Sequence, residues 1–271
     1  MSDAVWMGVE TRDAVCVPPW QETAQTWERA RRMGAWFGVR AVRRKHRSLA
    51  RILRDEGVAA VLVADAEPTW YHAQDLQHPF RFHPGMAWLR LQAMEQGQSD
   101  RLLTAADIAP GDTVLDATLG MGMDALVLAA GVSDTGRVIA CESSSVLART
   151  FTWAIRERQK YEPRLAEVLA RIEVQEREHA EWLSGLPDDS VDVVYFDPMF
   201  RRAPDRTTPL DAIRPFASPQ PLSDRAWREA CRVARKAVVL KERPHSGEFE
   251  RFGIRPDKPS ARFAYGVWRK R

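Results

Sequence analysis

The chain of 271 residues contains little cysteine, and its three thiols, Cys16, Cys141 and Cys231, have no paired spacing. That scarcity argues against a disulfide framework and against a cysteine-ligated zinc site. No apolar run approaches the roughly 20 residues that a membrane-spanning helix needs, and the polar N-terminus lacks a signal-peptide pattern. We therefore expect a cytoplasmic protein without a membrane segment, a disulfide or a bound metal.

The sequence also lacks a complete dinucleotide-binding fingerprint, because Ala125 stands where G-x-G-x-x-G has its third glycine. The apolar, β-branched run at 113–117 still predicts a strand that is buried on both faces of a sheet. Gly120 and Gly122 follow it, and both allow positive φ and close approach of a ligand to the backbone. A helical pattern at 124–130 completes the strand, turn and helix of a nucleotide-type cofactor site.

Acidic residues around this turn favour a particular ligand. Asp124 lies at the start of the predicted helix, where a negative charge suits a cationic ligand better than a pyrophosphate. Glu142 follows the next predicted strand, at 137–141, and a carboxylate there accepts hydrogen bonds from both hydroxyls of a ribose. S-adenosylmethionine carries a sulfonium ion, a ribose and no phosphate, so it matches both features. The residues expected to line its site are Asp116, Gly120, Gly122, Asp124 and Glu142.

A second motif, Asp-Pro-Met-Phe, follows a later apolar run at 191–196. Asp197 then lies at the carboxyl end of a predicted strand, the edge at which open α/β sheets bind ligands. Pro198 fixes its own φ and stiffens the turn, and Phe200 offers a face on which a flipped base can stack. A carboxylate held in this way accepts hydrogen bonds from an exocyclic amine and aligns it for methyl transfer. We expect Asp197, Pro198 and Phe200 to be catalytic.

Basic charge is concentrated in one stretch of the chain. Residues 29–54 hold ten of the 40 lysines and arginines and none of the 37 acidic residues, although the net charge is only +3. Trp36 and Phe37 interrupt the stretch, and such mixing of basic and aromatic side chains is typical of RNA-binding surfaces. The alternative is a solvated helix face. The side chains expected to contact an RNA substrate are Arg43, Arg44 and Lys45, with Arg201 and Arg202 beside the Asp-Pro-Met-Phe motif.

The pattern of elements predicts two domains. Residues 1–82 are expected to form a small, basic α/β accessory domain, with helices at 24–33 and 48–56, a strand at 58–64 and a linker at 67–84. Residues 83–271 are expected to form the catalytic domain. Apolar strands around Val114, Val138, Ile172, Val193 and Val238 alternate there with helical stretches, which predicts a doubly wound, Rossmann-like α/β sheet.

Two features are expected near the end of the catalytic domain. The proline-rich segment 202–221 is long and polar, and it is interpreted as a lid over the substrate. The runs at 251–254 and 262–268 are predicted to pair as an antiparallel hairpin.

The motifs D-A-T-x-G-x-G-x-D-A and V-V-Y-F-D-P-M-F resemble those of the class I S-adenosylmethionine-dependent methyltransferases. The Asp-Pro-Met-Phe form in particular resembles the RsmJ group, which methylates a guanine exocyclic amine in 16S ribosomal RNA. The resemblance covers roughly residues 82–241. It implies cofactor contacts at Met123, Asp124, Glu142, Ser143, Glu178, His179 and Asp197. We also expect Lys241, which ends the V-V-L-K strand in this region, to contact the substrate.

The resemblance implies a methyl transfer to guanine N2 of 16S rRNA, but the sequence departs from the group beside the Asp-Pro-Met-Phe motif. Residues 201–206 read Arg-Arg-Ala-Pro-Asp-Arg, where the group usually continues with Pro-His-Arg. An adenine-N6 methyltransferase of DNA or RNA therefore stays open as an alternative, because the same slot accepts either base amine. A non-catalytic RNA-binding protein with this fold is the remaining alternative.

Overall fold

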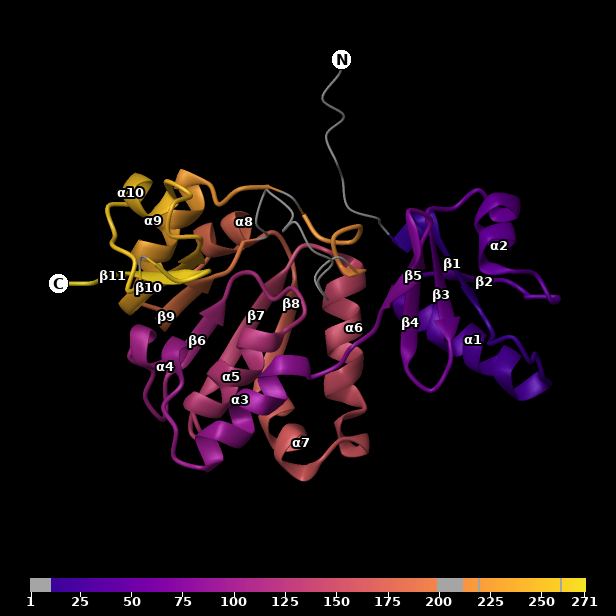
Figure 1. Cartoon of the computed structure of the whole chain (residues 1–271), viewed down its shortest axis with the longest axis horizontal. Coiled ribbons are helices and arrows are strands. Elements are labelled where there is room, and N and C mark those ends of the chain that lie inside the picture. Colours follow the sequence, from indigo (N-terminus) through magenta and orange to yellow (C-terminus); the bar gives the residue numbers. More distant parts are fainter. Residues whose placement is uncertain (1–10, 199–211, 219, 259) are drawn as a thin grey trace, which may run out of the picture. The chain divides into compact units, whose positions relative to one another are not determined.

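The computed structural model describes residues 11–198, 212–218, 220–258 and 260–271, which separate into two compact units (Figure 1). The first unit contains residues up to 83 together with 144–150 and 212–218. The second contains the remaining described residues from 84 onward. Phe200, Arg201 and Arg202, predicted above to contact the substrate, lie outside the described residues. The division into domains at residue 82 stays a prediction.

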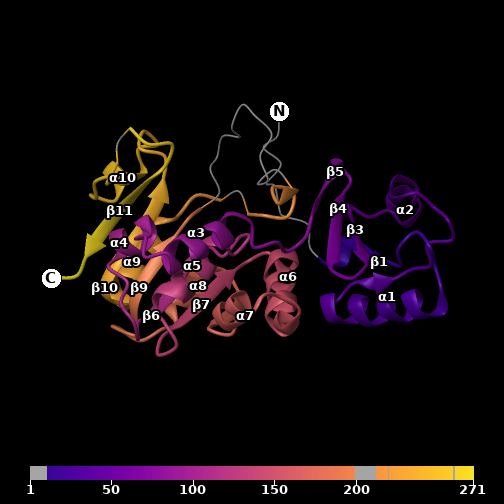
Figure 2. The same ribbon diagram turned by 60° about the horizontal axis from the view of Figure 1, so that its bottom comes forward.

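The first unit is built on a five-stranded sheet in the order β2-β1-β3-β4-β5, counting only strands of the described residues. Strands β1, β2 and β3 run parallel, whereas β4 and β5 complete the sheet as an antiparallel meander. Helices α1 and α2 connect the parallel strands, and α1 runs along the sheet (Figure 2). The bounds are β1 (Ala14–Val17), α1 (Ala24–Phe37), β2 (Arg40–Ala41), α2 (Leu49–Glu56), β3 (Ala60–Ala64), β4 (Pro68–His72) and β5 (Asp75–Phe80), with a 3-10 turn at Thr11–Asp13 before them.

Local signals in the sequence fix both helices of this unit. Thr23 caps α1 through a capping box, and Ser48 caps α2 by accepting a hydrogen bond from the amide of Arg51. Gly57 ends α2 with φ 65°, in the left-handed conformation that glycine adopts without strain. The predicted helices at 24–33 and 48–56 are therefore confirmed, and the first extends further, to Phe37.

The predicted linker at 67–84 is wrong, because β4 and β5 occupy most of it. Prolines and histidines weaken the strand signal of this segment, but its burial alternates as in a strand. Pro68, Trp70 and His72 are buried, and the residues between them are half-buried. Proline suits these strands because Pro68 is the first residue of β4 and Pro79 lies in an edge strand.

Four residues in the described part of the predicted lid are buried, namely Ile213, Pro215, Phe216 and Ala217. Phe216 is 1% exposed, and its ring packs at 5.7–6.1 Å from the rings of Trp70, His72 and Phe80. This aromatic cluster belongs to the first unit. The interpretation of 202–221 as a lid is therefore wrong for 213–217. Ser218, Gln220 and Pro221 are exposed, and 202–211 and 219 lie outside the described residues.

The second unit contains a six-stranded sheet in the order β11-β10-β9-β6-β7-β8, again among the described residues. All neighbours run parallel except β10 and β11, which are antiparallel. The strands are β6 (Thr113–Asp116), β7 (Arg137–Glu142), β8 (Ile172–Glu176), β9 (Val191–Phe196), β10 (Ala234–Glu242) and β11 (Ala264–Arg269). The helices are α3 (Gly85–Glu95), α4 (Arg101–Ala106), α5 (Met123–Gly131), α6 (Ser145–Arg156), α7 (Pro163–Leu169), α8 (His179–Ser184), α9 (Asp224–Val233) and α10 (Glu248–Arg251), with a 3-10 turn at Arg158–Lys160.

The parallel part of this sheet is doubly wound, as predicted. The chain moves outward from β6 through α5 to β7 on one side, and from β9 through α9 to β10 on the other. Right-handed crossovers in opposite directions place α5 and α9 on opposite faces of the sheet. The order of the strands reverses between β6 and β9, and this switch point is where open α/β sheets bind ligands.

The predicted antiparallel ending is present, but one partner was assigned wrongly. Strand β11 pairs with β10 over six residue pairs, and not with 251–254, which forms the end of α10 and the turn after it. Pairing with β10 places Trp268 and Val267 of β11 beside Val238 and Val239. Gly266 makes room for the displaced segment, since a Cβ there would lie 2.5 Å from the ring of Phe249.

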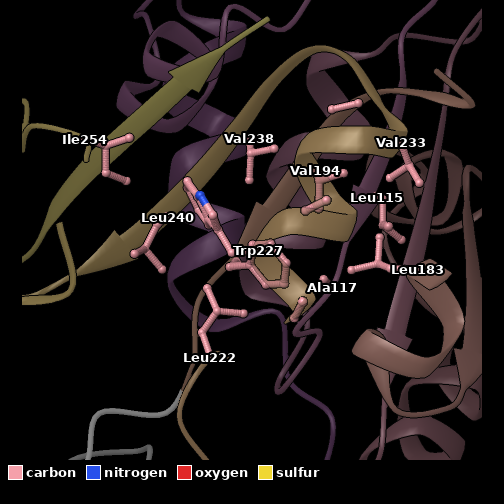
Figure 3. Close-up of a cluster of buried hydrophobic side chains, with 14 of the residues drawn as sticks. Leu115, Ala117, Leu183, Val194, Leu222, Trp227, Val233, Val238, Leu240 and Ile254 are labelled. Atoms are coloured by element: carbon pink, nitrogen blue, oxygen red, sulfur yellow. The ribbon is translucent and has the colours of Figure 1, made fainter. Parts of the chain in front are cut away.

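An apolar cluster holds the switch-point strands in place (Figure 3). Leu115 and Val194 extend from β6 and β9 toward Trp227 of α9, and all three are buried. Because this packing orders the strands up to their carboxyl ends, residues at those ends have fixed positions. None of the helices in the described residues is long and apolar enough to cross a bilayer.

Candidate active site

Three strands bring acidic and basic side chains to one edge of the sheet. Asp116 ends β6, and its register partner Tyr195 lies two residues before Asp197, which follows β9. On the next strand, Leu240 pairs with Phe196, so Lys241 lies beside Asp197. Parallel strands end at the same edge, and the sequence prediction that placed Asp116 and Asp197 there is consistent with this register.

The loop after β6 is tied to this edge by hydrogen bonds. The carboxylate of Asp116 accepts from the amide of Thr118 at 3.0 Å, and the hydroxyl of Thr118 accepts from the amide of Asp197 at 2.6 Å. Further along, the amide of Gly120 donates to Oε2 of Glu142 at 2.9 Å. The two sequence motifs are therefore linked directly, through Thr118, and the end of β7 is linked to the glycine turn.

The two glycines of the turn serve different purposes. Gly120 has φ 53°, and the nearest atom of the described residues to a Cβ placed there, its chain neighbours aside, is the carbonyl oxygen of Thr118 at 3.9 Å. Gly122 has φ 75° and is the N-cap of α5, and a Cβ there would lie 1.9 Å from the ring of Phe151. The space at Gly122 is therefore filled by a side chain of the protein, and contact of Gly120 with a ligand stays a prediction.

Asp124 is the centre of a buried charge network. Its Oδ1 accepts from Nη1 of Arg90 at 2.5 Å, and its Oδ2 accepts from Nζ of Lys241 and from the Tyr195 hydroxyl, both at 2.7 Å. Lys241 also donates to Oδ2 of Asp197 at 2.7 Å and so bridges the two carboxylates. Arg90 is itself held by two hydrogen bonds to Asp100. This network fixes the start of α5 against β9 and β10.

The network sets the ionisation of its members. Burial favours the neutral form of Asp124, but Lys241 and Arg90 outweigh it and hold the pKa of that carboxyl below its usual value. At Asp197, burial and the charge of Asp124 raise the pKa, despite the opposing effect of Lys241. The two aspartates raise the pKa of Lys241, although burial lowers it, so this lysine keeps its positive charge.

Asp116 has no such compensation. Its side chain is in a residue only 1% exposed, and burial raises its pKa to about 8, with the charges of Asp124, Asp197 and Glu142 adding to the effect. The edge therefore gathers four carboxyl groups around the glycine turn. A cation placed there would stabilise the ionised form of Asp116, so this edge of the sheet is suited to a positively charged ligand.

The other predicted cofactor residues surround the turn at the ends of β7 and β8. Glu142 is buried, and Ser143 after it is exposed. Glu178 is the N-cap of α8, accepting from the amide of Glu181, and the ring of His179 lies edge-on to Phe196 at 5.7 Å. Burial lowers the pKa of His179. Met123 is half-buried at the start of α5. Cofactor contact by these residues stays a prediction.

Sequence reasoning missed two members of the network, Arg90 and Tyr195. Arg90 lies in the otherwise largely apolar run 86–91, and a single arginine in such a run is a signal of a buried partner. Tyr195 was assigned to the strand correctly, but nothing in the sequence indicates that its hydroxyl bonds Asp124. Lys241 was predicted to contact substrate, and both of its ion pairs in the described residues are instead internal.

The predicted RNA-contacting residues of the first unit differ in exposure. Arg43 is exposed and pairs with Glu22 at 2.6 Å, Lys45 is exposed, and Arg44 is 9% exposed. Pro198 is half-buried beside Asp197. Across the described part of the chain, no group of three or more His, Cys, Asp or Glu side chains is arranged to hold a metal ion.

Comparison with known proteins gives the same picture of the second unit. Residues 80–258 match the family described as "Putative SAM-dependent methyltransferase", where SAM is S-adenosylmethionine. The uncharacterized protein YpiP of Bacillus subtilis is 40% identical over 196 residues, which are 69% of this chain and 74% of that protein. The solved structure of the SAM-dependent methyltransferase NGO1261 from Neisseria gonorrhoeae has a TM-score of 0.61 at 18% identity, covering 94% of this chain and 95% of that one, and supports the fold.

Two further relatives carry a more specific name. Ribosomal RNA small subunit methyltransferase J of Laribacter hongkongensis is 37% identical over 140 residues, and that of Nitrosococcus oceani is 32% identical over 151 residues. The matches cover 49% and 53% of this chain, and 47% and 56% of the two relatives, so the chain matches about half the length of each.

The acidic edge around Gly120 fits a sulfonium-bearing ligand, and the family match covers the strands and turns that form it. The cofactor is therefore S-adenosylmethionine. The chain belongs to the SAM-dependent methyltransferase family, as a class I member that is similar to the RsmJ group.

Proposed function

We propose that the protein transfers a methyl group from SAM to an exocyclic base amine of RNA, namely guanine N2 of 16S rRNA. The observation that carries the proposal is Asp197: its amide is fixed by Thr118, its carboxylate is bridged by Lys241 to Asp124, and 28% of its side chain is exposed. The similarity to the two rRNA methyltransferases supports RNA as the substrate.

The chemistry requires an amine to be made more nucleophilic and to be oriented. Bound SAM supplies an electrophilic methyl group on a positively charged sulfur. The amine of a base is conjugated with its ring, and a hydrogen bond from that amine to the Asp197 carboxylate increases the electron density on nitrogen. Because Lys241 and Thr118 hold Asp197 in place, we propose that the residue aligns the amine for in-line displacement.

A proton must leave during this reaction. As the new N–C bond forms and the S–C bond breaks, the amine becomes cationic and loses one of its protons. Burial raises the pKa of Asp197, so its carboxylate is a stronger base than an exposed one. We propose that Asp197 accepts this proton, and Pro198 restricts the turn that presents it. Phe200 is proposed to stack on the base.

The raised pKa of Asp116 predicts a pH dependence of SAM affinity. Asp116 is protonated below about pH 8 in the protein without ligand, and a bound sulfonium ion favours its ionised form. Binding then releases a proton, so affinity rises by up to about tenfold per pH unit and levels off above the pKa. Calorimetric titration with SAM at a series of pH values measures this slope, and Asp116→Asn is expected to flatten it. An unchanged slope in that variant would show that another group takes up the proton.

The basic stretch of the first unit is proposed to contact RNA phosphates. Arg43 and Lys45 are exposed in the turn after β2, and a protein that neutralises phosphates releases counterions. Lys45→Gln is therefore expected to weaken RNA binding similarly for all sequences. It should also lower the slope of log K against log salt concentration by about 0.7 for a single strand. Fluorescence anisotropy across a salt series measures the slope, and wild-type behaviour would exclude Lys45 from the interface.

The substrate class is tested by transfer of labelled methyl from SAM in separate reactions with total RNA, DNA and protein from a strain that lacks this chain. Label in the RNA alone is the expected result. Label in DNA would support the adenine amino-methyltransferase alternative. SAM binding without transfer to any of the three fractions would contradict the proposal and favour a non-catalytic protein.

A further inference from the structure

A tryptophan is exposed on the first unit beside the basic turn. Trp20 is 54% exposed, and large apolar side chains with this exposure are few among the described residues. It lies in the loop after β1, and the basic turn 42–47 follows β2. Because β1 and β2 are parallel neighbours, both loops leave the same edge of this sheet.

An arginine and a histidine contact this tryptophan. The guanidinium of Arg44 lies 5.2 Å from the centre of the Trp20 ring, and the His46 ring approaches it edge-on at 6.2 Å. Next to this group, the guanidinium of Arg43 lies 4.3 Å from the centre of the Trp27 ring. The tryptophan ring is therefore ordered by its neighbours while more than half of it stays accessible to solvent.

Glu22 joins the two loops. Its carboxylate accepts from Nη1 of Arg43 at 2.6 Å and from the amides of Arg44 and Lys45 at 3.0 and 3.3 Å. Lys45 and His46 have φ values of 49° and 56°, a left-handed conformation that is uncommon for side-chain-bearing residues and uncommon twice in succession. The hydrogen bonds to Glu22 help to offset that strain and hold the turn in this shape.

We propose that Trp20 is a stacking platform for an unpaired RNA base, with Arg44 holding the indole ring and Lys45 and Arg43 facing the flanking phosphates. The inference rests on RNA being the substrate, as proposed above, and adds a contact on the first unit. An aromatic face combined with positive charge matches the two parts of a single strand, its bases and its backbone. The three positive charges of Arg43, Arg44 and Lys45 exceed the single negative charge of Glu22, so this part of the surface has the opposite charge to RNA.

The test compares two probes of equal length: a single-stranded RNA that carries the fluorescent base 2-aminopurine, and an abasic sugar-phosphate strand. Trp20→Ala is expected to weaken binding of the RNA by between about fivefold and about 150-fold, the range measured for one stacked base, and to leave the abasic strand unaffected. Trp20→Phe should restore most of the affinity and the quenching of 2-aminopurine. Arg81→Gln, which removes an exposed charge of the same unit outside the basic stretch 29–54, is the matched control and should have little effect on base-dependent binding.

The outcomes separate this inference from the proposed function. Unchanged RNA binding by Trp20→Ala, in a protein that still methylates RNA, would overturn the stacking platform and leave the proposed function in place. Trp20-dependent RNA binding without methyl transfer would support the stacking platform and overturn the proposed function. Equal losses on the RNA and on the abasic strand would show that Trp20 only supports the fold of the loop, and would also overturn the inference. Absence of binding to either probe by the wild-type protein would overturn it as well.

Discussion

Lys241→Met is expected to lower the free energy of unfolding by about 3 kcal/mol, at the low end of the range for removing one partner of a buried ion pair. The variant leaves Asp197 without the ammonium group that bridges it to Asp124, and leaves Asp124 with Arg90. For a domain of this size the fall in Tm is roughly 6–12 °C. Thermal unfolding at neutral pH measures it.

Lys160→Met is the control for this prediction. Lys160 lies in the 3-10 turn of the same unit and pairs with Glu157, and 50% and 25% of the two side chains are exposed, so the loss is expected to be about 1 kcal/mol or less. Lys241→Arg should retain much of the stability because it keeps the charge. Equal effects of the two methionine substitutions would mean that the bridge between Asp124 and Asp197 adds no stability beyond that of a surface pair.

Asp197→Asn is expected to reduce kcat by at least about 100-fold, the lower range for loss of a general base. An amide of the same shape cannot take up the amine proton, and it meets Lys241 less favourably than a carboxylate does. The affinity for SAM should stay close to that of the wild type, because the glycine turn and the acids of β6 and β7 are unchanged. Single-turnover methyl transfer and calorimetric titration with SAM measure the two quantities.

Asp192→Asn serves as the control for catalysis. Asp192 lies on the same strand, β9, and pairs with Arg235 near the opposite end from Asp197. It should change kcat little, even if stability falls. Wild-type turnover by Asp197→Asn would refute the catalytic assignment, and parallel losses in SAM affinity and kcat would assign Asp197 to cofactor binding instead.

The sequence predicted the parts of the site whose functional residues lie in a recognisable local pattern of the backbone. A glycine turn after a buried strand and an Asp-Pro step after another are local patterns, and the parallel register then brings Asp116 and Asp197 together. The salt bridge of Arg90 depends on how α3 packs against α5, and those of Lys241 depend on the pairing of β10 with β9 beside α5, which no local pattern encodes. The two internal partners of Lys241 therefore had no signal in the sequence, and its contact with substrate stays a prediction.

The errors in the fold have a similar cause. Strands β4 and β5 contain prolines and histidines, which weaken the strand signal, and the pairing of β4 with β3 and of β5 with β4 decides their structure. The end of the chain was predicted as a local hairpin because two apolar runs were close in sequence. Strand β11 instead pairs with β10, so the tertiary partner prevailed over the local one.

We propose that this chain methylates guanine N2 in small-subunit rRNA. Mass spectrometry of nucleosides from purified 16S rRNA measures the product, N2-methylguanosine, itself. Three strains are compared: one lacking the chain, one complemented with it, and one complemented with the Asp197→Asn variant. We predict that N2-methylguanosine falls in the first, returns in the second and stays low in the third. Equal amounts of N2-methylguanosine in all three strains would contradict the account, and a change confined to N6-methyladenosine would reassign the substrate to adenine.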